Sequence, residues 1–189
     1  MIEPSEYPEL WDFLGSLHQG DLLTGTVSAV EPFGVFVALD DGPEHPLFPG
    51  VGFIALPELS WQRCDDASDV VQVGQRVSCE FLQFDTYNGE ARLSLRATRP
   101  DPFEAFAERT EIGQRLHGRV AKVLPFGVLV EVAEGIEGVV HLSELLEPSA
   151  NATGKDLGPG DDITVAVTGL DRRRRTVSLS QRQAPPHRR

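Results

Sequence analysis

The sequence predicts an all-β fold with short helices, arranged as two five-stranded barrels in tandem joined by a short helix. The first observation behind this is an internal repeat, because "GDLLTGTVSAVEPFGVFVAL" at 20–39 and "GQRLHGRVAKVLPFGVLVEV" at 113–132 are identical at 10 of 20 positions. The second is that short stretches in each copy alternate apolar and polar residues between turn signals, which is typical of small barrels. The third is size, because 189 residues with 40% hydrophobic content can bury two small cores.

The elements are expected in the order helix, barrel, helix, barrel and tail. An apolar stripe that includes Leu10, Trp11 and Leu14 predicts the N-terminal helix. Between the repeats, Asp101 is a good N-cap and Pro102 suits the first helical position, so a short helix should join the barrels. The divisions are 1–17 for the first helix, 18–99 for the first barrel, 100–111 for the helical linker, 112–183 for the second barrel and 184–189 for a flexible tail.

The strands of the second copy can be placed from its alternation. A hairpin around Phe126 and Gly127 should point Val128 and Val130 inward and Leu129 outward. The remaining strands are expected at 138–141, 163–170 and 176–180. Five strands in a repeat of this size suit an OB-type barrel, which can bind single-stranded nucleic acid on one strand face.

The first copy differs in the loop between its second and third strands. It carries seven extra residues in the Gly- and Pro-rich stretch "DDGPEHPLFPGV", which should lie on the surface. Strand parity points Phe36 of this copy outward, between two inward valines. An outward aromatic side chain indicates a ligand surface, unless the long loop or the N-terminal helix covers it.

Charge is unevenly distributed in this acidic chain, whose net charge is -12. Residues 1–111 contain 20 acidic and 6 basic side chains, a net of -14, whereas residues 112–189 contain 9 acidic and 11 basic ones, a net of +2. The acidic half is most simply a solubilising surface, and the alternative is that it docks on a basic protein such as a ribosomal protein. The second half can still attract phosphate, because its bases are clustered in Arg172–Arg175.

Three ordered blocks of the second copy resemble a known family: "IGQRLHGRVAKVLPFGVLVEVAEGIEGVVHLSELL", "GPGDDITVAVTGLD" and "TVSLS". They resemble the RNA-binding domain named after ribosomal protein S1, an OB-fold family of translation, RNA decay and transcription proteins. The first copy repeats the blocks, so the resemblance covers residues 18–183. It implies two tandem RNA-binding domains of this type.

The resemblance also implies an RNA face. The family places one aromatic at the Phe-Gly turn, a second on the next strand, a His on the third strand, an Asp at the end of the fourth and an Arg at the start of the fifth. In the second copy these positions hold Phe126, Leu129, His141, Asp171 and Thr176, with Arg173 and Arg175 as nearby cations. In the first copy they hold Phe33, Phe36, Ala55, Asp85 and Arg92. Each copy therefore keeps part of the set.

Each candidate also has a structural alternative. Phe33 and Phe126 could pack in the core beneath their turns, and His141 could be a purely structural residue. Asp171 could accept backbone hydrogen bonds in its turn, a role compatible with orienting an arginine. The arginine run could be a targeting tag or a solvated turn, and the repeat favours a hairpin connection that clamps phosphate at the edge of the Phe126 and His141 face.

The expected function is non-enzymatic binding of single-stranded RNA, mainly through the second barrel, and the alternative is a protein-interaction adaptor that uses the acidic first barrel. No phosphate loop, metal-ligand spacing or catalytic constellation is recognisable, so no cofactor and no metal are expected. Cys64 and Cys79 are expected to be plain thiols. The acidic N-terminal stretch and the lack of a long apolar run lead us to expect a cytoplasmic protein without membrane contact.

Overall fold

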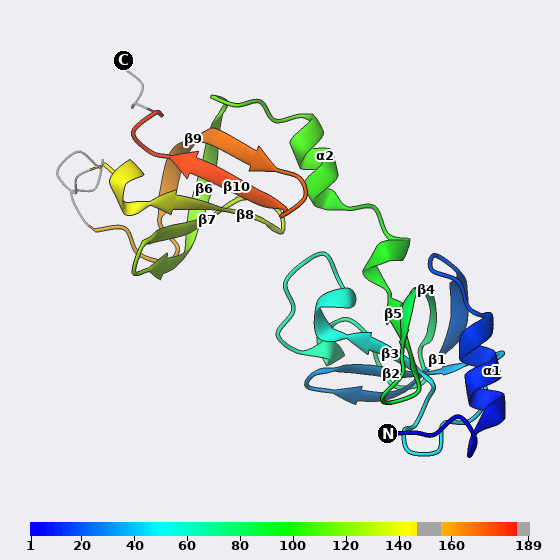
Figure 1. Cartoon of the computed structure of the whole chain (residues 1–189). Helices are drawn as coiled ribbons and strands as arrows, with labels where there is room; N and C mark the ends of the chain where they lie inside the picture. The colour runs from blue at the N-terminus through cyan, green and yellow to red at the C-terminus, as the bar shows by residue number, and fades with distance from the viewer. Residues whose placement is uncertain (147–155, 185–189) are drawn as a thin grey trace. The chain divides into compact units, whose positions relative to one another are not determined.

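The computed structural model describes residues 1–146 and 156–184, and it divides into two compact units after Asp101 (Figure 1). Each unit contains one closed barrel of five strands. Within the described residues, α-helix is limited to two short segments. The predicted fold class is therefore confirmed. The tail predicted at 184–189 lies outside the described residues, apart from Ala184.

The first unit is a barrel with the strand order β1-β2-β3-β5-β4. Its strands are β1 (Leu22–Glu31), β2 (Gly34–Leu39), β3 (Gly52–Ala55), β4 (Arg76–Asp85) and β5 (Glu90–Ser94), with 3₁₀ turns at Leu56–Glu58, Ala67–Asp69 and Arg96–Thr98. Helix α1 (Pro8–Ser16) lies against the barrel, because Leu10 and Leu14 are buried in the same core as the inward valines Val35 and Val37. The inward parity predicted for β2 is thus observed.

The second unit repeats this architecture with the order β10-β8-β7-β6-β9. Its elements are α2 (Pro102–Glu108), β6 (Arg115–Leu124), β7 (Gly127–Ala133), β8 (Ile136–His141), a 3₁₀ turn at Leu142–Glu144, β9 (Asp162–Asp171) and β10 (Thr176–Ser180). Phe103 and Phe106 of α2 are buried in one cluster with Val128 and Val130 of the barrel. The helix between the repeats is therefore packed into the second barrel's core.

The shared Pro-Phe-Gly-Val segment has a packing reason in both barrels. A Cβ atom on Gly127 would lie 2.2 Å from the carbonyl oxygen of Val140, and one on Gly34 would lie 2.4 Å from the carbonyl oxygen of Ile54. Both distances are too short for any side chain. The hairpin strand can approach its neighbour this closely only with glycine at this position.

Candidate nucleic-acid interface

Strands β7, β8 and β10 of the second barrel share an outward surface, which we call its outer face. The strand register sets three residues side by side across this face: Leu129, Val139 and Ser178. Strands β2, β3 and β5 form the outer face of the first barrel, and its corresponding row is Phe36, Phe53 and Arg92. Because directly paired residues lie on the same side of a sheet, the two outer faces can be compared position by position.

Phe126 and His141 stand together at one end of the second outer face. Gly127 pairs with His141 in the register, and the rings of Phe126 and His141 lie 6.2 Å apart between centroids. Phe126 is 52% exposed and His141 is exposed as well. Phe126 does not pack in the core, so its ring and the imidazole are open to a ligand.

Residues Arg172–Arg175 connect β9 to β10, and we call this connection the arginine turn. It lies at the opposite end of strands β8 and β10 from Phe126 and His141. Because β8 and β10 run parallel with Val177 level with Gly138, Arg175 and His141 are separated by roughly 16 Å along the strands, at about 3.3 Å per residue. The register therefore corrects the expectation that the turn adjoins Phe126 and His141. Figure 1 shows the β9–β10 turn beside α2.

Two of the four arginines engage helix α2. Arg172 Nη1 donates a hydrogen bond to Glu104 Oε2 at 3.0 Å, and the Arg175 guanidinium lies over the Phe103 ring, 5.6 Å from its centroid. Asp171 accepts the backbone N–H of Arg174 at 2.9 Å, which is the turn role considered for it. Arg173 and Arg174 are exposed, and the Arg174 guanidinium lies at 4.0 Å from Asp171 Oδ2 at the surface, so both are better placed than the half-buried Arg175 to meet phosphate.

The first outer face is richer in aromatic side chains, and it is covered at Phe36. Phe33 is 60% exposed, but Phe36 is only 7% exposed although it points out of the barrel. The ring of Phe48, from the loop between β2 and β3, stacks on Phe36 with centroids 5.3 Å apart and planes 19° from parallel. Phe53 completes the cluster, 5.1 Å from Phe36. Of the two possibilities for Phe36, the structure shows coverage by the long loop.

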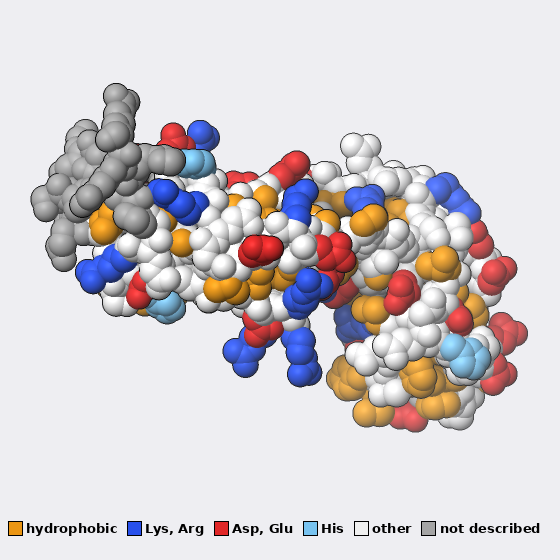
Figure 2. Space-filling view, turned by 90° about the horizontal axis from the view of Figure 1, so that it is seen from above, with side chains coloured by type: hydrophobic (Ala, Val, Ile, Leu, Met, Phe, Trp, Pro, Cys, Tyr) orange, Lys and Arg blue, Asp and Glu red, His pale blue; other side chains and the backbone are white. Residues whose placement is uncertain are grey.

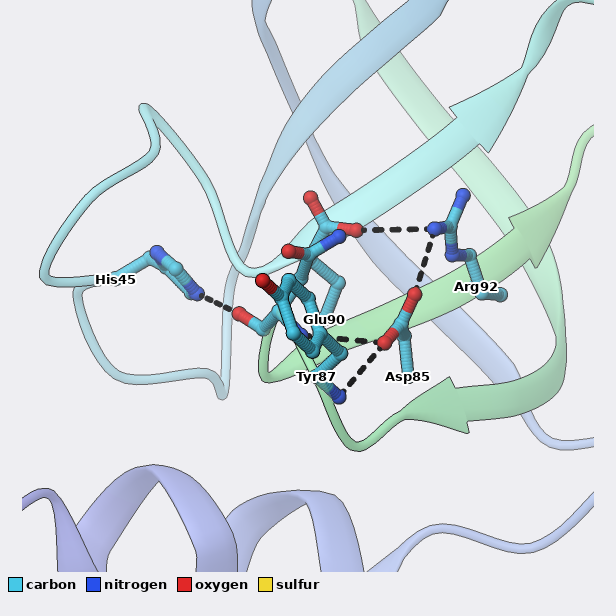
Figure 3. A network of polar contacts seen from close by, with 6 residues as sticks. His45, Asp85, Tyr87, Glu90 and Arg92 are labelled. Atoms are coloured by element: carbon cyan, nitrogen blue, oxygen red, sulfur yellow. Dashed lines mark hydrogen bonds and ion pairs between the residues drawn. The ribbon is translucent and has the colours of Figure 1, made fainter. Parts of the chain in front are cut away.

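Asp85 and Arg92 of the first barrel belong to one polar network (Figure 3). Asp85 accepts the backbone N–H groups of Tyr87 and Asn88 and a hydrogen bond of 2.8 Å from Arg92 Nη2, and this last bond lowers the pKa of the Asp85 carboxyl. Arg92 also lies 3.4 Å from the Glu90 carboxylate and over the Phe53 ring. Burial raises the pKa of Glu90. The Arg92 charge is thus largely compensated within the barrel.

The two units differ in surface charge. In the view of Figure 2, several acidic side chains lie on the surface of the first unit, while lysine and arginine side chains project from the second unit. This agrees with the net charges of -14 for residues 1–111 and +2 for residues 112–189. A polyanion would meet less repulsion at the second unit.

Neither a metal-ligand cluster nor a membrane-spanning helix is found in the described part of the chain. No group of three or more His, Cys, Asp or Glu side chains there could hold a metal ion. None of the helices described is long and apolar enough to cross a membrane.

The sequence of each barrel matches one family. The model of the S1 RNA binding domain matches residues 16–96 and again residues 109–182. The chain belongs to the S1 RNA-binding domain family. Its two S1 domains correspond to the two barrels, and the resemblance seen in the sequence blocks is confirmed.

Curated relatives of this pair of S1 domains are ribosomal proteins. The small ribosomal subunit protein bS1 of Mycobacterium tuberculosis is 42% identical over 174 residues, which cover 92% of this chain and 34% of that protein. The bS1 proteins of Staphylococcus haemolyticus and Neisseria meningitidis are 32% and 31% identical, over 92% and 90% of this chain and 42% and 29% of their own lengths. The chain thus spans less than half the length of these relatives.

The strand register corrects one equivalence between the two S1 domains. The sequence alignment set Arg92 against Thr176, but Glu90 pairs with Asp85 as Thr176 pairs with Asp171, so Thr176 corresponds to Glu90 and Arg92 to Ser178. The first domain therefore has a buried carboxyl where the family has an arginine. With this correction, the β4–β5 and β9–β10 connections each contain four residues. Gly89 and Arg175 are the last residues of these connections, and both have a left-handed backbone conformation, with φ of 66° and 53°.

Sequence reasoning missed two residues of these faces. Lys122 is exposed and pairs with Leu129 at the margin of the second outer face, whereas the first domain has Ala29 paired with Phe36. This difference stood in the repeat alignment, as "VAKV" against "VSAV", and could have been found there. Phe48 carried no such signal, because the second repeat has no counterpart of the long loop.

Proposed function

We propose that this protein binds single-stranded RNA mainly through the outer face of its second S1 domain, in the cytoplasm and in connection with translation. Membership of the S1 RNA-binding domain family and the similarity to bS1 support RNA binding linked to translation in general terms. The observation that carries the choice of domain is the exposed pair of Phe126 and His141, on a unit that is not strongly acidic.

The contacts follow from the chemistry of the face. A base unstacked from a single strand can stack on the Phe126 ring, and His141 stands close enough to contact the same nucleotide. Lys122 at the margin of the face, and Arg173 and Arg174 at the far end of the strands, supply charges for phosphates further along the RNA strand. Aromatic stacking accepts any base, so sequence preference should be weak.

The test compares equivalent aromatics in the intact chain. Binding of a fluorescein-labelled 12-nucleotide oligouridine is followed by anisotropy for the unaltered protein, for Phe126→Ala and for the matched control Phe33→Ala. Since stacking contributes about 1 to 3 kcal/mol per base, Phe126→Ala should weaken binding by about five-fold to 150-fold. Phe33→Ala should change it less than about two-fold. A larger loss with Phe33→Ala would assign the RNA to the first domain instead.

A second candidate function is that of an adaptor which docks a basic protein on the first unit. The net charge of -14 for residues 1–111 favours it, because complementary charge steers association. The discriminating measurement is a pull-down of ribosomes from lysate, before and after ribonuclease. Retention of intact ribosomal proteins after complete RNA digestion supports the adaptor, and full loss supports binding through RNA.

A further inference from the structure

The loop between β2 and β3 of the first S1 domain, residues 40–51, is the element that most distinguishes the two domains. Fifteen positions separate the paired residues Val37 and Gly52, whereas eight separate Val130 and Gly138, so this long loop has seven additional residues. It reaches over the outer face and places Phe48 on Phe36. The second domain has only a short turn here, and no ring contact with Leu129 is found among the described residues.

The contact of Phe48 with Phe36 has the geometry of a stacked base. The two rings lie 5.3 Å apart between centroids and 19° from parallel, and single-stranded nucleic acids use the same flat stacking on aromatic side chains. While Phe48 is in place, Phe36 is 7% exposed and cannot receive a base. Phe48 therefore covers the surface of the Phe36 ring on which a base could stack.

His45 fastens the long loop in this position (Figure 3). Its Nε2 lies 2.8 Å from the carbonyl oxygen of Asn88 in the β4–β5 turn, while its Nδ1 accepts the backbone N–H groups of Leu47 and Phe48 at 3.2 and 3.0 Å. These partners require a neutral imidazole that is protonated on Nε2. The His45 ring also stacks on Phe48, with centroids 4.8 Å apart. One buried side chain thus fixes both the path of the loop and the ring that it carries.

We infer that the long loop is an intramolecular cap that excludes single-stranded RNA from the first S1 domain, with Phe48 in the place of a base and His45 as the latch. This inference rests on the proposed function, since it explains why RNA is directed to the second domain although the first has more aromatic residues. Phe48 and His45 then influence where RNA binds on the chain without contacting the RNA themselves.

The experiment opens the cap in a chain whose second face has been disabled. In the full chain carrying Phe126→Ala and His141→Ala, Phe48→Ala is compared with Leu47→Ala, a neighbour in the same loop that is 71% exposed. Phe48→Ala should raise the affinity for the 12-nucleotide oligouridine by about five-fold or more, as expected for one stacked base, and Leu47→Ala should leave it unchanged. Ultraviolet crosslinks should then map to the peptide that contains Phe36.

Two further arms make the result decisive. An uncharged morpholino oligomer of the same sequence removes repulsion by the acidic surface, so a gain seen only with this probe still supports the cap. His45→Ala is a second opening variant, and tryptophan fluorescence reports its folding, because Trp11 and Trp61 both lie in the first unit.

The inference is overturned if folded Phe48→Ala behaves as Leu47→Ala does with both probes. It is also overturned if Phe48→Ala and His45→Ala each unfold the first domain, because the loop is then part of the barrel's framework. Failure of the proposed function is seen separately, as unchanged RNA affinity in the Phe126→Ala and His141→Ala chain that retains Phe48. A gain with Phe48→Ala in that situation would still establish the cap.

Discussion

Across the middle of the outer face, the first barrel has Phe36, Phe53 and Arg92, and the second barrel has Leu129, Val139 and Ser178. The first set has the residue types that bind single-stranded nucleic acid, yet the Phe36 ring is covered by Phe48 and Arg92 is paired with two carboxylates. The second set is plain, and it lies beside an exposed Phe and His. The difference indicates that aromatic content and accessibility are separate properties of such a face, because a buried ring cannot receive a base.

The comparison assumes that both barrels have the same backbone arrangement, in which a glycine packs directly against the neighbouring strand. The largest expected effect tests this shared backbone arrangement, called the shared frame below. Gly127→Ala should destabilise the second barrel and Gly34→Ala the first by about 3 kcal/mol each, because the new methyl group would overlap a carbonyl oxygen. Gly169→Ala and Gly15→Ala are the controls, since their Cβ atoms meet only ordinary contacts or open space. Denaturant unfolding followed by circular dichroism and by tryptophan fluorescence separates the barrels. Equal stability of Gly127→Ala and Gly169→Ala would contradict the shared frame.

The arginine turn should divide into two pairs with different effects. Replacing Arg173 and Arg174 with serine should reduce the log-log salt slope of RNA binding by about 1.4, from about 0.7 per phosphate on a single strand. Replacing Arg172 and Arg175 should instead lower the melting temperature of the second unit, because these side chains contact Glu104 and Phe103. The prediction is contradicted if replacing Arg172 and Arg175 reduces the salt slope while replacing Arg173 and Arg174 lowers the melting temperature.

A smaller change should make the second face more like the first. Ser178→Arg places a cation where Arg92 lies, without the Glu90 carboxylate beside it, since the equivalent residue is Thr176. We expect tighter RNA binding and a salt slope steeper by about 0.7. Ser178→Gln is the matched control for side-chain size. An unchanged slope with Ser178→Arg would place the phosphates away from the middle of the face.

The smallest expected effect is the pH dependence of the stability that His45 gives to the long loop. Burial lowers the pKa of His45 below its ordinary value, against the opposing hydrogen bond to the Asn88 carbonyl, so the folded state favours neutral imidazole. Its stabilising contribution is complete above pH about 6.5, the ordinary histidine pKa, and is lost as the pH falls through the lowered folded value.

The tryptophan-monitored melting temperature should therefore fall on acidification more steeply in the unaltered chain than in His45→Gln. Asp85 and Glu90, the acids of the adjoining turn, together with Arg92, are common to both proteins, so the difference isolates His45. Identical pH profiles would show that His45 does not titrate in this range.

Sequence reasoning predicted what local pattern determines. Alternation set the inward valines and the outward direction of Phe36, and the repeat placed the Phe-Gly turns, because strand parity is a local property. The sequence left open whether Phe36 is exposed or covered, because the cover depends on His45 meeting a carbonyl 43 residues away. The equivalence of Arg92 was misjudged because the "LSL" and "VSLS" segments align equally well in two registers, and only strand pairing distinguishes them.

Helix α2 determines where the chain can be cut to study its domains apart. A fragment that begins at residue 112 would omit Phe103 and Phe106, which are buried in the second core, and losing even one such ring costs about 3 to 5 kcal/mol. That loss is a large part of the stability of a small domain. A cut after Asp101 keeps the helix with the barrel that it completes. Weak RNA binding by the fragment that begins at residue 112 would therefore reflect an unfolded core. The RNA affinity of the second outer face can be measured only with the fragment that begins at residue 102.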